Sequence, residues 1–327
     1  MSQIIVENLM KTFKVAKRKP GLWNAVQGLV HREYNTVHAL EGISFKLEEG
    51  ELVGYIGPNG AGKSTTVKIL SGILVPDSGR CEVMGKVPWK QRIDHVKNIG
   101  VVFGQRSQLW WDLPVEDSFQ LLRDIYNIPH QNYKSTRDEL IEILNISTLL
   151  DVPVRQLSLG QRMKCELAAS LLHTPPLLFL DEPTIGLDAV SKLAVRDFIK
   201  KINKERGVTV ILTTHDMDDI EALCSRVVVI GRGKILSDGT IEELRNHVSK
   251  ERKLTVHMDM PIDNFSIPGA RVVELEGQQI SLAFNPEYIS PAILISNLYE
   301  KYPVKDLFIE NTPIEEIIAK LYGELRI

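Results

Sequence analysis

The sequence predicts an open α/β fold followed by a smaller α+β domain, and three observations support this. Short apolar runs alternate with helical patterns up to about residue 240, a glycine-rich loop joins one such run to a helix, and the pattern changes after about Gly239. Alternating strands and helices are typical of a parallel sheet that binds its ligand at the carboxyl ends of its strands. At 327 residues the chain has room for two domains, and we expect them at 1–240 and 241–327.

The composition is that of an ordinary globular protein. The formal net charge is −3, with 43% apolar and 25% charged residues, which argues neither for nor against nucleic acid. We expect no secretion signal, and no window reaches the ~18 uninterrupted apolar residues of a membrane span. The three cysteines, Cys81, Cys165 and Cys224, lack metal-ligand spacing, so we interpret them as buried or incidental thiols in a reducing cytoplasm.

Near its beginning the chain predicts a strand and then an amphipathic helix. Residues 4–6 are apolar and β-branched, and five basic residues without an acid occupy 11–19. Apolar residues then follow at helical spacing, namely Leu22, Trp23, Val26, Leu29 and Val30. Such a helix packs on its own domain or lies against a membrane surface or membrane partner, and the pattern leaves both interpretations open.

The next segment predicts a strand, a phosphate-binding loop and a helix. Residues 37–45 and 52–56 are strand-like, and 65–70 begin a helix. Between the second strand and the helix, the pattern G-x-x-x-x-G-K-[ST] is matched at every fixed position by Gly57, Pro58, Asn59, Gly60, Ala61, Gly62, Lys63 and Ser64.

Each residue type in this loop has a physical reason. Glycines have no Cβ, so the backbone can curl until its N–H groups point at phosphate oxygens. Lys63 adds positive charge for the β- and γ-phosphates, and the Ser64 hydroxyl is placed to bind Mg2+. The helix that follows, beginning near Thr65, turns its N–H groups toward the anion. A bare glycine turn is the alternative, but it would not require Lys63.

A helical insertion separates the strands in the middle of the chain. Residues 81–84 and 99–103 are strand-like, and the second of these runs ends at Gly104 and Gln105. From about 106 to 165 the pattern is helical, with apolar residues three and four apart over 115–126 and 137–150.

Charged side chains lie at or just after the ends of two later strands. Residues 177–180 form an apolar run that ends in Asp181 and Glu182, and 208–213 precede His215. An acidic pair after an apolar strand is costly unless positive charge lies nearby, which favours a functional site over a surface strand end. A further strand is expected at 226–230.

The last segment predicts a small α+β domain without a catalytic constellation. Its strands alternate in polarity or are strand-like, and its helices show apolar spacing. We expect strands at 254–258, 271–275, 280–284 and 306–310, and helices at 291–299 and 313–321.

Together these motifs resemble the nucleotide-binding subunit of ATP-binding cassette (ABC) transporters over roughly residues 3 to 240. The order of the motifs is that of the family. Besides the loop at 57–64, the matches are Gln105 for the Q-loop, residues 157–161 for the signature motif, 177–182 for the Walker B strand with its glutamate, 185–188 for the D-loop, and His215 for the switch histidine. Phe13 resembles the aromatic residue that stacks on adenine, and core packing is the alternative for this side chain.

The resemblance implies an enzyme that binds and hydrolyses ATP with Mg2+. Asp181 would complement Ser64 at the metal, and Gln105 would contribute to the metal and water shell. Glu182 would polarise the attacking water, and His215 would contact the γ-phosphate.

The resemblance also implies partner chains. Ser158, Gly160 and Gln161 would act on ATP bound to a second ATPase subunit, most simply a second copy. Integral-membrane permease subunits would hold the pair at the cytoplasmic face of the membrane. Trp110 and Trp111 would lie against the permease, with burial inside the helical insertion as the alternative.

One position departs from the commonest signature motif. Leu159 stands where that motif has glycine, and its side chain either crowds the facing nucleotide or points away. This wording of the signature, together with residues 102–105, 110–114 and 312–316, resembles the drug- and sodium-exporter branch, whose permeases are separate ABC-2-type chains. We therefore expect export of an unidentified substrate.

Two other functions remain as alternatives. A cassette ATPase that acts on nucleic acid or ribosomes usually carries a long coiled coil or a second cassette, and neither pattern is visible, so no nucleic-acid partner is expected. A nucleotide sensor without turnover would lack Glu182 or His215, and both are present.

Overall fold

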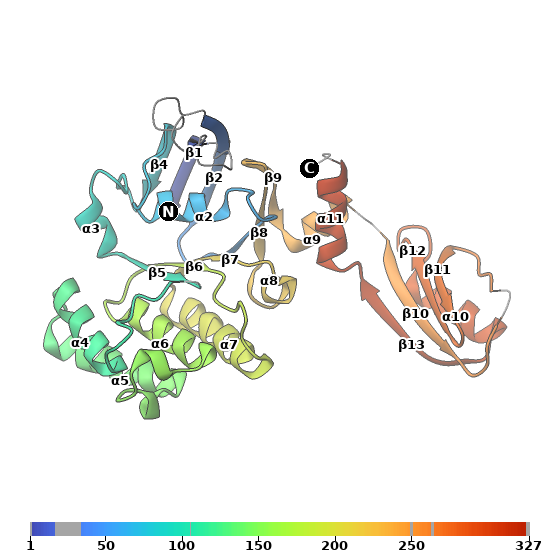
Figure 1. The fold of residues 1–327 in the computed structure, drawn as a ribbon. Helices are drawn as coiled ribbons and strands as arrows, with labels where there is room; N and C mark the ends of the chain where they lie inside the picture. The colour runs from blue at the N-terminus through green and yellow to red at the C-terminus, as the bar shows by residue number, and fades with distance from the viewer. Residues whose placement is uncertain (1, 17–33, 105, 249–250, 263–264, 325–327) are drawn as a thin grey trace, which may run out of the picture. The chain divides into compact units, whose positions relative to one another are not determined.

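The computed structural model divides into two compact units, Met1–Gly239 and Thr240–Ile327 (Figure 1). The amphipathic segment expected at 22–30 and the Q-loop residue Gln105 lie outside the described residues. The structure describes residues 2–16, 34–104, 106–248, 251–262 and 265–324.

A six-stranded sheet forms the centre of the first unit. Its strands from β5 to β8 pair in parallel, and β3 and β7 are buried along their whole length. Apolar runs without alternation suit strands that are covered on both faces. In spatial order the strands are β5 (Ile99–Phe103), β6 (Leu177–Asp181), β7 (Thr209–Thr213), β3 (Leu52–Ile56), β8 (Arg226–Gly231) and β9 (Lys234–Thr240).

Three strands expected from the sequence form a separate antiparallel sheet. Its order is β2 (Tyr34–Glu48), β1 (Ser2–Ala16) and β4 (Ser78–Val83). Along the second half of β2 buried and exposed residues alternate, because one face of an antiparallel sheet can remain in water. Helix α2 (Lys63–Leu70) contacts β2, β4 and β6, and Figure 1 shows it between the two sheets.

Helices cover the other side of the parallel sheet. Helix α6 packs on β5 and on α4, α5 and α7, and Figure 1 shows α6 and α7 below the sheet. The helices of the first unit after α2 are α3 (Arg92–Val96), α4 (Val115–Tyr126), α5 (His130–Leu144), α6 (Leu159–Leu171), α7 (Ala189–Arg206) and α8 (Met217–Leu223), with 3-10 turns at Ser147–Leu149 and Val154–Gln156.

One boundary in the helical insertion differs from the expectation. The helix expected at 137–150 is α5, which follows Pro129 and ends before Asn145. Asn145 has φ 51° and ψ 58°, the left-handed conformation that commonly terminates helices. The apolar spacing continued past this residue, so the sequence pattern placed the helix too late.

The second unit has its own core around a four-stranded antiparallel sheet. One face of the sheet packs on α10, where Leu294 and Leu298 are fully buried. Helix α9 contacts α11. The elements are α9 (Ile241–Val248), β10 (Arg252–Met258), β11 (Ala270–Glu276), β12 (Gln279–Phe284), α10 (Pro291–Lys301), β13 (Val304–Asn311) and α11 (Ile314–Glu324), with the strands in the order β11-β12-β10-β13. Across the described parts of both units, no helix has the length and apolar character to cross a membrane.

Candidate active site

The glycine-rich loop has the tight geometry that its sequence predicts. Gly60 and Gly62 have φ values of 80° and 114°, which side chains with a Cβ rarely adopt. A Cβ on Gly57 would lie 2.3 Å from the carbonyl oxygen of Ile230, and one on Gly62 would lie 2.6 Å from that of Ala39. The loop therefore needs glycine both for its conformation and for close approach to neighbouring backbone.

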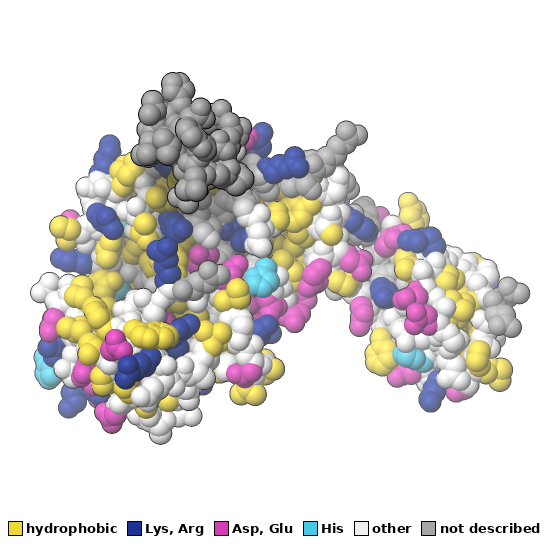
Figure 2. Space-filling view, viewed as in Figure 1, with side chains coloured by type: hydrophobic (Ala, Val, Ile, Leu, Met, Phe, Trp, Pro, Cys, Tyr) yellow, Lys and Arg dark blue, Asp and Glu magenta, His cyan; other side chains and the backbone are white. Residues whose placement is uncertain are grey.

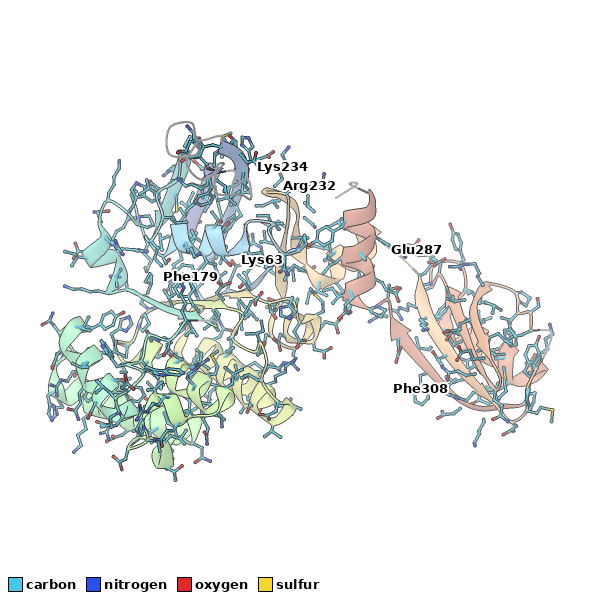
Figure 3. The ribbon with its side chains drawn as sticks, viewed as in Figure 1. Lys63, Phe179, Arg232, Lys234, Glu287 and Phe308 are labelled. Atoms are coloured by element: carbon cyan, nitrogen blue, oxygen red, sulfur yellow. The ribbon has the colours of Figure 1, made fainter. Side chains whose placement is uncertain are left out.

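Helix α2 opens directly from this loop. Gly62 is its N-cap, so the helix has no side-chain cap. The free N–H groups and the helix dipole favour an anion at this end. Figure 3 marks Lys63, whose Nζ donates to the carbonyl oxygens of Gly57, at 2.6 Å, and Pro58, at 3.2 Å.

Electrostatics at Lys63 combine burial with nearby acids. The residue is only 6% exposed. Burial lowers the pKa of its ammonium group, while the charges of Glu182 and Asp181 oppose that shift. A buried cation near two carboxylates is suited to bind the negatively charged oxygens of a phosphate group that is accompanied by a metal ion.

Asp181 ends β6 beside the loop. Thr213, at the end of the neighbouring strand β7, donates its hydroxyl to Asp181 Oδ1 at 2.5 Å, and Ser64 Oγ lies 3.5 Å from the same oxygen. Hydroxyl and carboxylate oxygens are the hard ligands that Mg2+ prefers. In the described parts of the chain no group of three or more His, Cys, Asp and Glu could hold a metal.

Glu182 occupies a strained backbone position next to Asp181. Its φ is 56°, a value uncommon for a residue with a side chain. Its backbone N–H donates to the carbonyl oxygen of Thr213 at 2.9 Å. Its Oε1 lies 3.5 Å from Nδ1 of His215, so the two side chains predicted for catalysis face each other.

One cavity brings together most of the predicted catalytic and phosphate-binding residues. Its volume is about 930 Å³, in the range of small-molecule sites. Gly104 and Arg106, the neighbours of Gln105, contribute to its wall, and so do Lys68 and Ile73, which the sequence did not single out. The lining residues are Gly57, Pro58, Asn59, Ser64, Lys68, Ile73, Phe103, Gly104, Arg106, Asp181, Glu182, Ile185 and His215.

Phe13 stands apart from the described lining of this cavity. It lies on β1 opposite Val37, is partly exposed, and has Lys11 Nζ at 5.6 Å from its ring centroid. Stacking on adenine therefore stays a prediction for this residue.

The signature motif begins α6 with a capping box. Ser158 Oγ accepts a hydrogen bond from the Gln161 backbone N–H at 3.2 Å, and Gln161 Oε1 accepts one from the Ser158 N–H at 2.9 Å. Both residues are exposed, and neither belongs to the described lining of the cavity. These two residues of the motif therefore face solvent and not the phosphate loop of their own chain.

The middle of the signature packs on the D-loop of the same chain. A Cβ on Gly160 would lie 2.3 Å from Ser191 Oγ, and Ser191 is held by Asp188, the N-cap of α7. The Cδ2 atom of Leu159 lies 3.0 Å from the position of a Cβ on Gly186. Leu159 is therefore directed at the D-loop of its own chain.

The two tryptophans are exposed, which contradicts burial within the insertion. Trp110 is 38% and Trp111 is 53% exposed, and Figure 2 shows hydrophobic side chains gathered on the helical part that carries α4. The guanidinium of Arg162, on the first turns of α6, lies 5.8 Å from the Trp111 ring centroid, within cation–π range.

Glu166 holds the segment between Gln105 and the tryptophans. It is 4% exposed, accepts hydrogen bonds from the hydroxyl of Ser107 and the N–H of Gln108, and burial raises its pKa. The sequence offered one signal for this residue, an acid that interrupts the apolar residues of α6.

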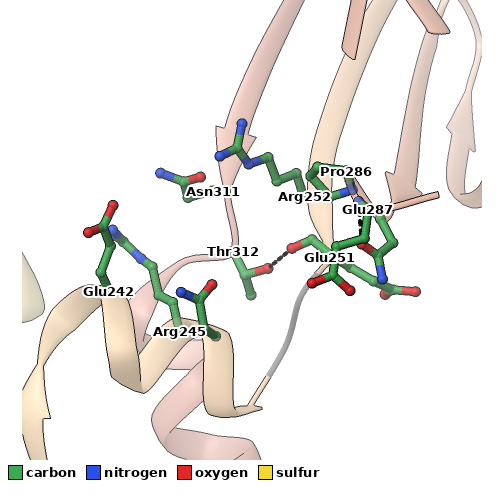
Figure 4. A pocket seen from close by; sticks show the side chains of 10 residues that line it. Glu242, Arg245, Glu251, Arg252, Pro286, Glu287, Asn311 and Thr312 are labelled. Carbon is green, nitrogen blue, oxygen red and sulfur yellow. Dashed lines mark hydrogen bonds between the residues drawn. The ribbon is translucent and has the colours of Figure 1, made fainter. Parts of the chain in front are cut away.

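The second unit contains a polar cavity of about 510 Å³ (Figure 4). Arginine and glutamate side chains both line it, and Thr312 donates to the carbonyl oxygen of Glu251 at 2.8 Å. The lining residues are Glu242, Arg245, Asn246, Glu251, Arg252, Asn285, Pro286, Glu287, Asn311 and Thr312.

The geometry of the first unit defines a nucleotide hydrolase with a phosphate-binding loop, and comparisons with known proteins give its family. The family model described as ABC transporter matches residues 40–185. The linearmycin resistance ATP-binding protein LnrL of Bacillus subtilis is 34% identical over 215 residues, which are 66% of this chain and 68% of that protein. The methionine import ATP-binding protein MetN 2 of Enterococcus faecalis is 32% identical over 278 residues, 82% of this chain and 80% of that protein.

Solved structures agree on the fold. The structure titled "Dimeric structure of a post-hydrolysis state of the ATP-binding cassette MJ0796 bound to ADP and Pi" has a TM-score of 0.61 and 23% identity, and covers 73% of this chain and 98% of that chain. The structure of cbiO1 from Clostridium perfringens has a TM-score of 0.60 and 27% identity, and covers 76% of this chain and 94% of that chain. The chain belongs to the family of ABC transporter ATP-binding subunits, which confirms the predicted α/β fold and an ATP-binding, ATP-hydrolysing function.

Proposed function

We propose that this chain powers export of an unidentified substrate through separate ABC-2-type permease subunits. The division of the site supports the part of this proposal that concerns a pair of ATPase chains. Residues at both ends of the phosphate loop line the cavity together with Glu182 and His215, whereas Ser158 and Gln161 of the signature are exposed. Such a chain contributes two different half sites, and a second ATPase copy would complete both.

Within one half site each side chain has a defined task. The loop N–H groups, the N-terminus of α2 and Lys63 hold the phosphates of ATP. Ser64 and Asp181, whose oxygens lie 3.5 Å apart, are the residues for Mg2+, which when bound neutralises charge on the β- and γ-phosphates.

Glu182 and His215 are the residues placed for the chemical step. Glu182 orients a water molecule and accepts its proton as the water oxygen bonds to the γ-phosphorus. The bond from that phosphorus to the bridging oxygen breaks, and ADP and phosphate leave. His215, whose Nδ1 lies 3.5 Å from Glu182 Oε1, would hydrogen-bond the γ-phosphate.

Exposed aromatic residues support docking to a permease. Trp111 is 53% exposed, and the guanidinium of Arg162 lies 5.8 Å from its ring centroid. Large aromatics and arginine are enriched in the cores of protein interfaces. This docking would place the chain at the cytoplasmic face of a membrane.

Export is favoured by two relatives whose names refer to resistance. LnrL is one, and the daunorubicin resistance ATP-binding protein DrrA3 of Streptomyces coeruleorubidus is 34% identical over 221 residues, 68% of this chain and 69% of that protein. Import is a second candidate, because MetN 2, named for methionine import, aligns with 82% of this chain.

Purification of the tagged chain from its own membranes in mild detergent tests this function. We expect two multi-span membrane proteins and no solute-binding protein. Co-purification of a solute-binding lipoprotein would favour import, and ribosomes or nucleic acid in place of membrane proteins would contradict a transport function.

A matched pair of variants tests the docking surface. Trp111→Ser removes an aromatic residue from this surface, and we expect membrane-protein recovery to fall about tenfold or more, as for an interface hot spot. Tyr288→Ser removes an aromatic side chain in the second unit that is 88% exposed and should leave recovery unchanged. Equal recovery for both variants would contradict docking through Trp111.

A further inference from the structure

Asp219 on α8 is a fully buried carboxylate beside the active site. Its exposure is 0%, and an unpaired charge there would be costly. Arg196 of α7 pairs with it, with Nε 2.5 Å from Oδ1. This pairing leaves the other carboxylate oxygen, Oδ2, for different partners.

Two threonines donate to Oδ2 from two different catalytic segments. One is Thr184, whose hydroxyl donates from the turn that follows Glu182. The other is Thr214, whose hydroxyl lies 3.3 Å away, in the residue directly before His215. A single carboxylate oxygen thus connects the segments that carry Glu182 and His215.

The surrounding charges form an ordered set between α7 and α8. Asp216 accepts from Lys192 at 2.5 Å and lies 3.6 Å from Arg196. The backbone N–H of Asp216 also donates to the hydroxyl of Thr214 at 3.0 Å. Of these groups only Asp219 contacts Thr184, so it alone reaches both catalytic segments.

The strained backbone conformation of Glu182 is the reason why a contact that fixes its segment matters. A left-handed conformation at a residue with a side chain is strained and persists only where the surroundings impose it. The Glu182 N–H is held by Thr213, and the turn is closed by the Ile185 N–H, 3.3 Å from the Glu182 carbonyl oxygen. Thr184, inside this turn and 2% exposed, is anchored by Asp219.

We propose that Asp219 is a positioning residue for ATP hydrolysis, which holds Glu182 and His215 in a fixed register through Thr184 and Thr214. The proposal rests on the roles proposed above for Glu182 and His215. Displacement of a reacting group by about 1 Å can cost about 100-fold in rate, whereas nucleotide binding depends on the separate phosphate loop. The positioning contact should therefore control kcat and leave KM nearly unchanged.

Thr184→Val is the main test, because it removes the hydroxyl and keeps both the β-branched shape and the ion pair between Asp219 and Arg196. We expect kcat of ATP hydrolysis to fall about tenfold, with KM for ATP within about twofold. Thr184→Ser restores a hydroxyl and should recover most of kcat. Lys192→Ala breaks an ion pair between the same two helices without touching Thr184 and should leave kcat within about twofold of the original.

Asp219→Asn provides an independent variant, with folding checked by circular dichroism. It should lower kcat at least as much as Thr184→Val, and the two changes together should cost less than the product of their separate effects, because they interrupt one contact. Unchanged kcat in Thr184→Val, or no recovery in Thr184→Ser, would overturn the proposal.

Glu182→Gln, measured in parallel, distinguishes failure of the catalytic role of Glu182 from failure of the positioning role of Asp219. If it keeps the original rate, the proposed role of Glu182 fails by itself. If it removes activity while Thr184→Val keeps full kcat, only the positioning role of Asp219 fails.

Discussion

The phosphate loop and the signature motif show two ways in which a helix start can be used. The N-cap of α2 is Gly62, without a side chain, so its N–H groups are free for a ligand. The N-cap of α6 is Ser158, whose hydroxyl accepts from Gln161 in a capping box, and this end is exposed. The start of α2 lies at a cavity of its own chain. The start of α6 is capped by its own side chains and exposed, so a partner chain could cover it.

The largest expected effect concerns the cavity side of this comparison. Glu182→Gln keeps the size of the side chain but removes the carboxylate that we propose accepts a proton, so kcat should fall about 100- to 10,000-fold. ATP binding should persist, because the loop and Lys63 are unchanged. Steady-state ATPase assays together with nucleotide titration check this, and equal rates for the two proteins would contradict the catalytic assignment.

A negative charge at the signature motif should lower ATPase activity without lowering the stability of the protein. Ser158→Asp keeps a good N-cap but places a negative charge where a facing nucleotide would lie. We expect ATPase activity to fall about tenfold or more, about 1.4 kcal/mol or more at the transition state, with an unchanged melting temperature.

Mixing two inactive variants tests whether the signature acts on a second copy. Lys63→Ala damages the phosphate loop and Ser158→Asp damages the signature, so a mixed pair keeps one intact composite site. Activity should reappear on mixing. A mixture as inactive as its components would indicate that each chain uses its own signature.

A smaller effect is expected where the signature motif packs on the start of helix α7 in the same chain. Gly160→Ala places a Cβ 2.3 Å from Ser191 Oγ, so unfolding free energy should fall by about 1–3 kcal/mol, as in overpacked cores. Gly323→Ala is the control, because Gly323 lies in α11, where no atom of the described neighbouring residues is within 4 Å of the added Cβ. It should be neutral or slightly stabilising, and urea denaturation measures both variants.

The smallest expected effect is a pH dependence of stability at His173, which belongs to neither compared region. Burial lowers the pKa of His173, whose Nε2 donates to the carbonyl oxygen of Ile99 at 2.9 Å and whose ring stacks on Tyr126. The unfolded state then binds a proton before the folded state does. Stability should decline as pH falls below about 6.5, and His173→Gln should reduce that slope in melting curves taken between pH 7.5 and 5.5. An unchanged slope would contradict a neutral buried His173.

The contacts that organise the site were not visible in the sequence. Thr213 contacts Asp181 across 32 positions, and Ser107 contacts Glu166 across 59. Neither pair belongs to a local motif, because the partners meet only after strands and helices have taken their places. Asp219 likewise looked like one of several acids near the start of α8, until burial and its partners distinguished it.

The sequence alone predicted the chemistry of the phosphate loop and of the acidic strand end. A glycine-rich turn, a lysine and an acidic pair after an apolar strand predict phosphate and metal binding from local patterns, because backbone freedom and charge act over a few residues. Only the tertiary structure decided which groups meet. The sheet order placed β6 beside β7, so that Asp181 meets Thr213, and packing turned Leu159 toward the D-loop of its own chain while Trp111 stayed exposed.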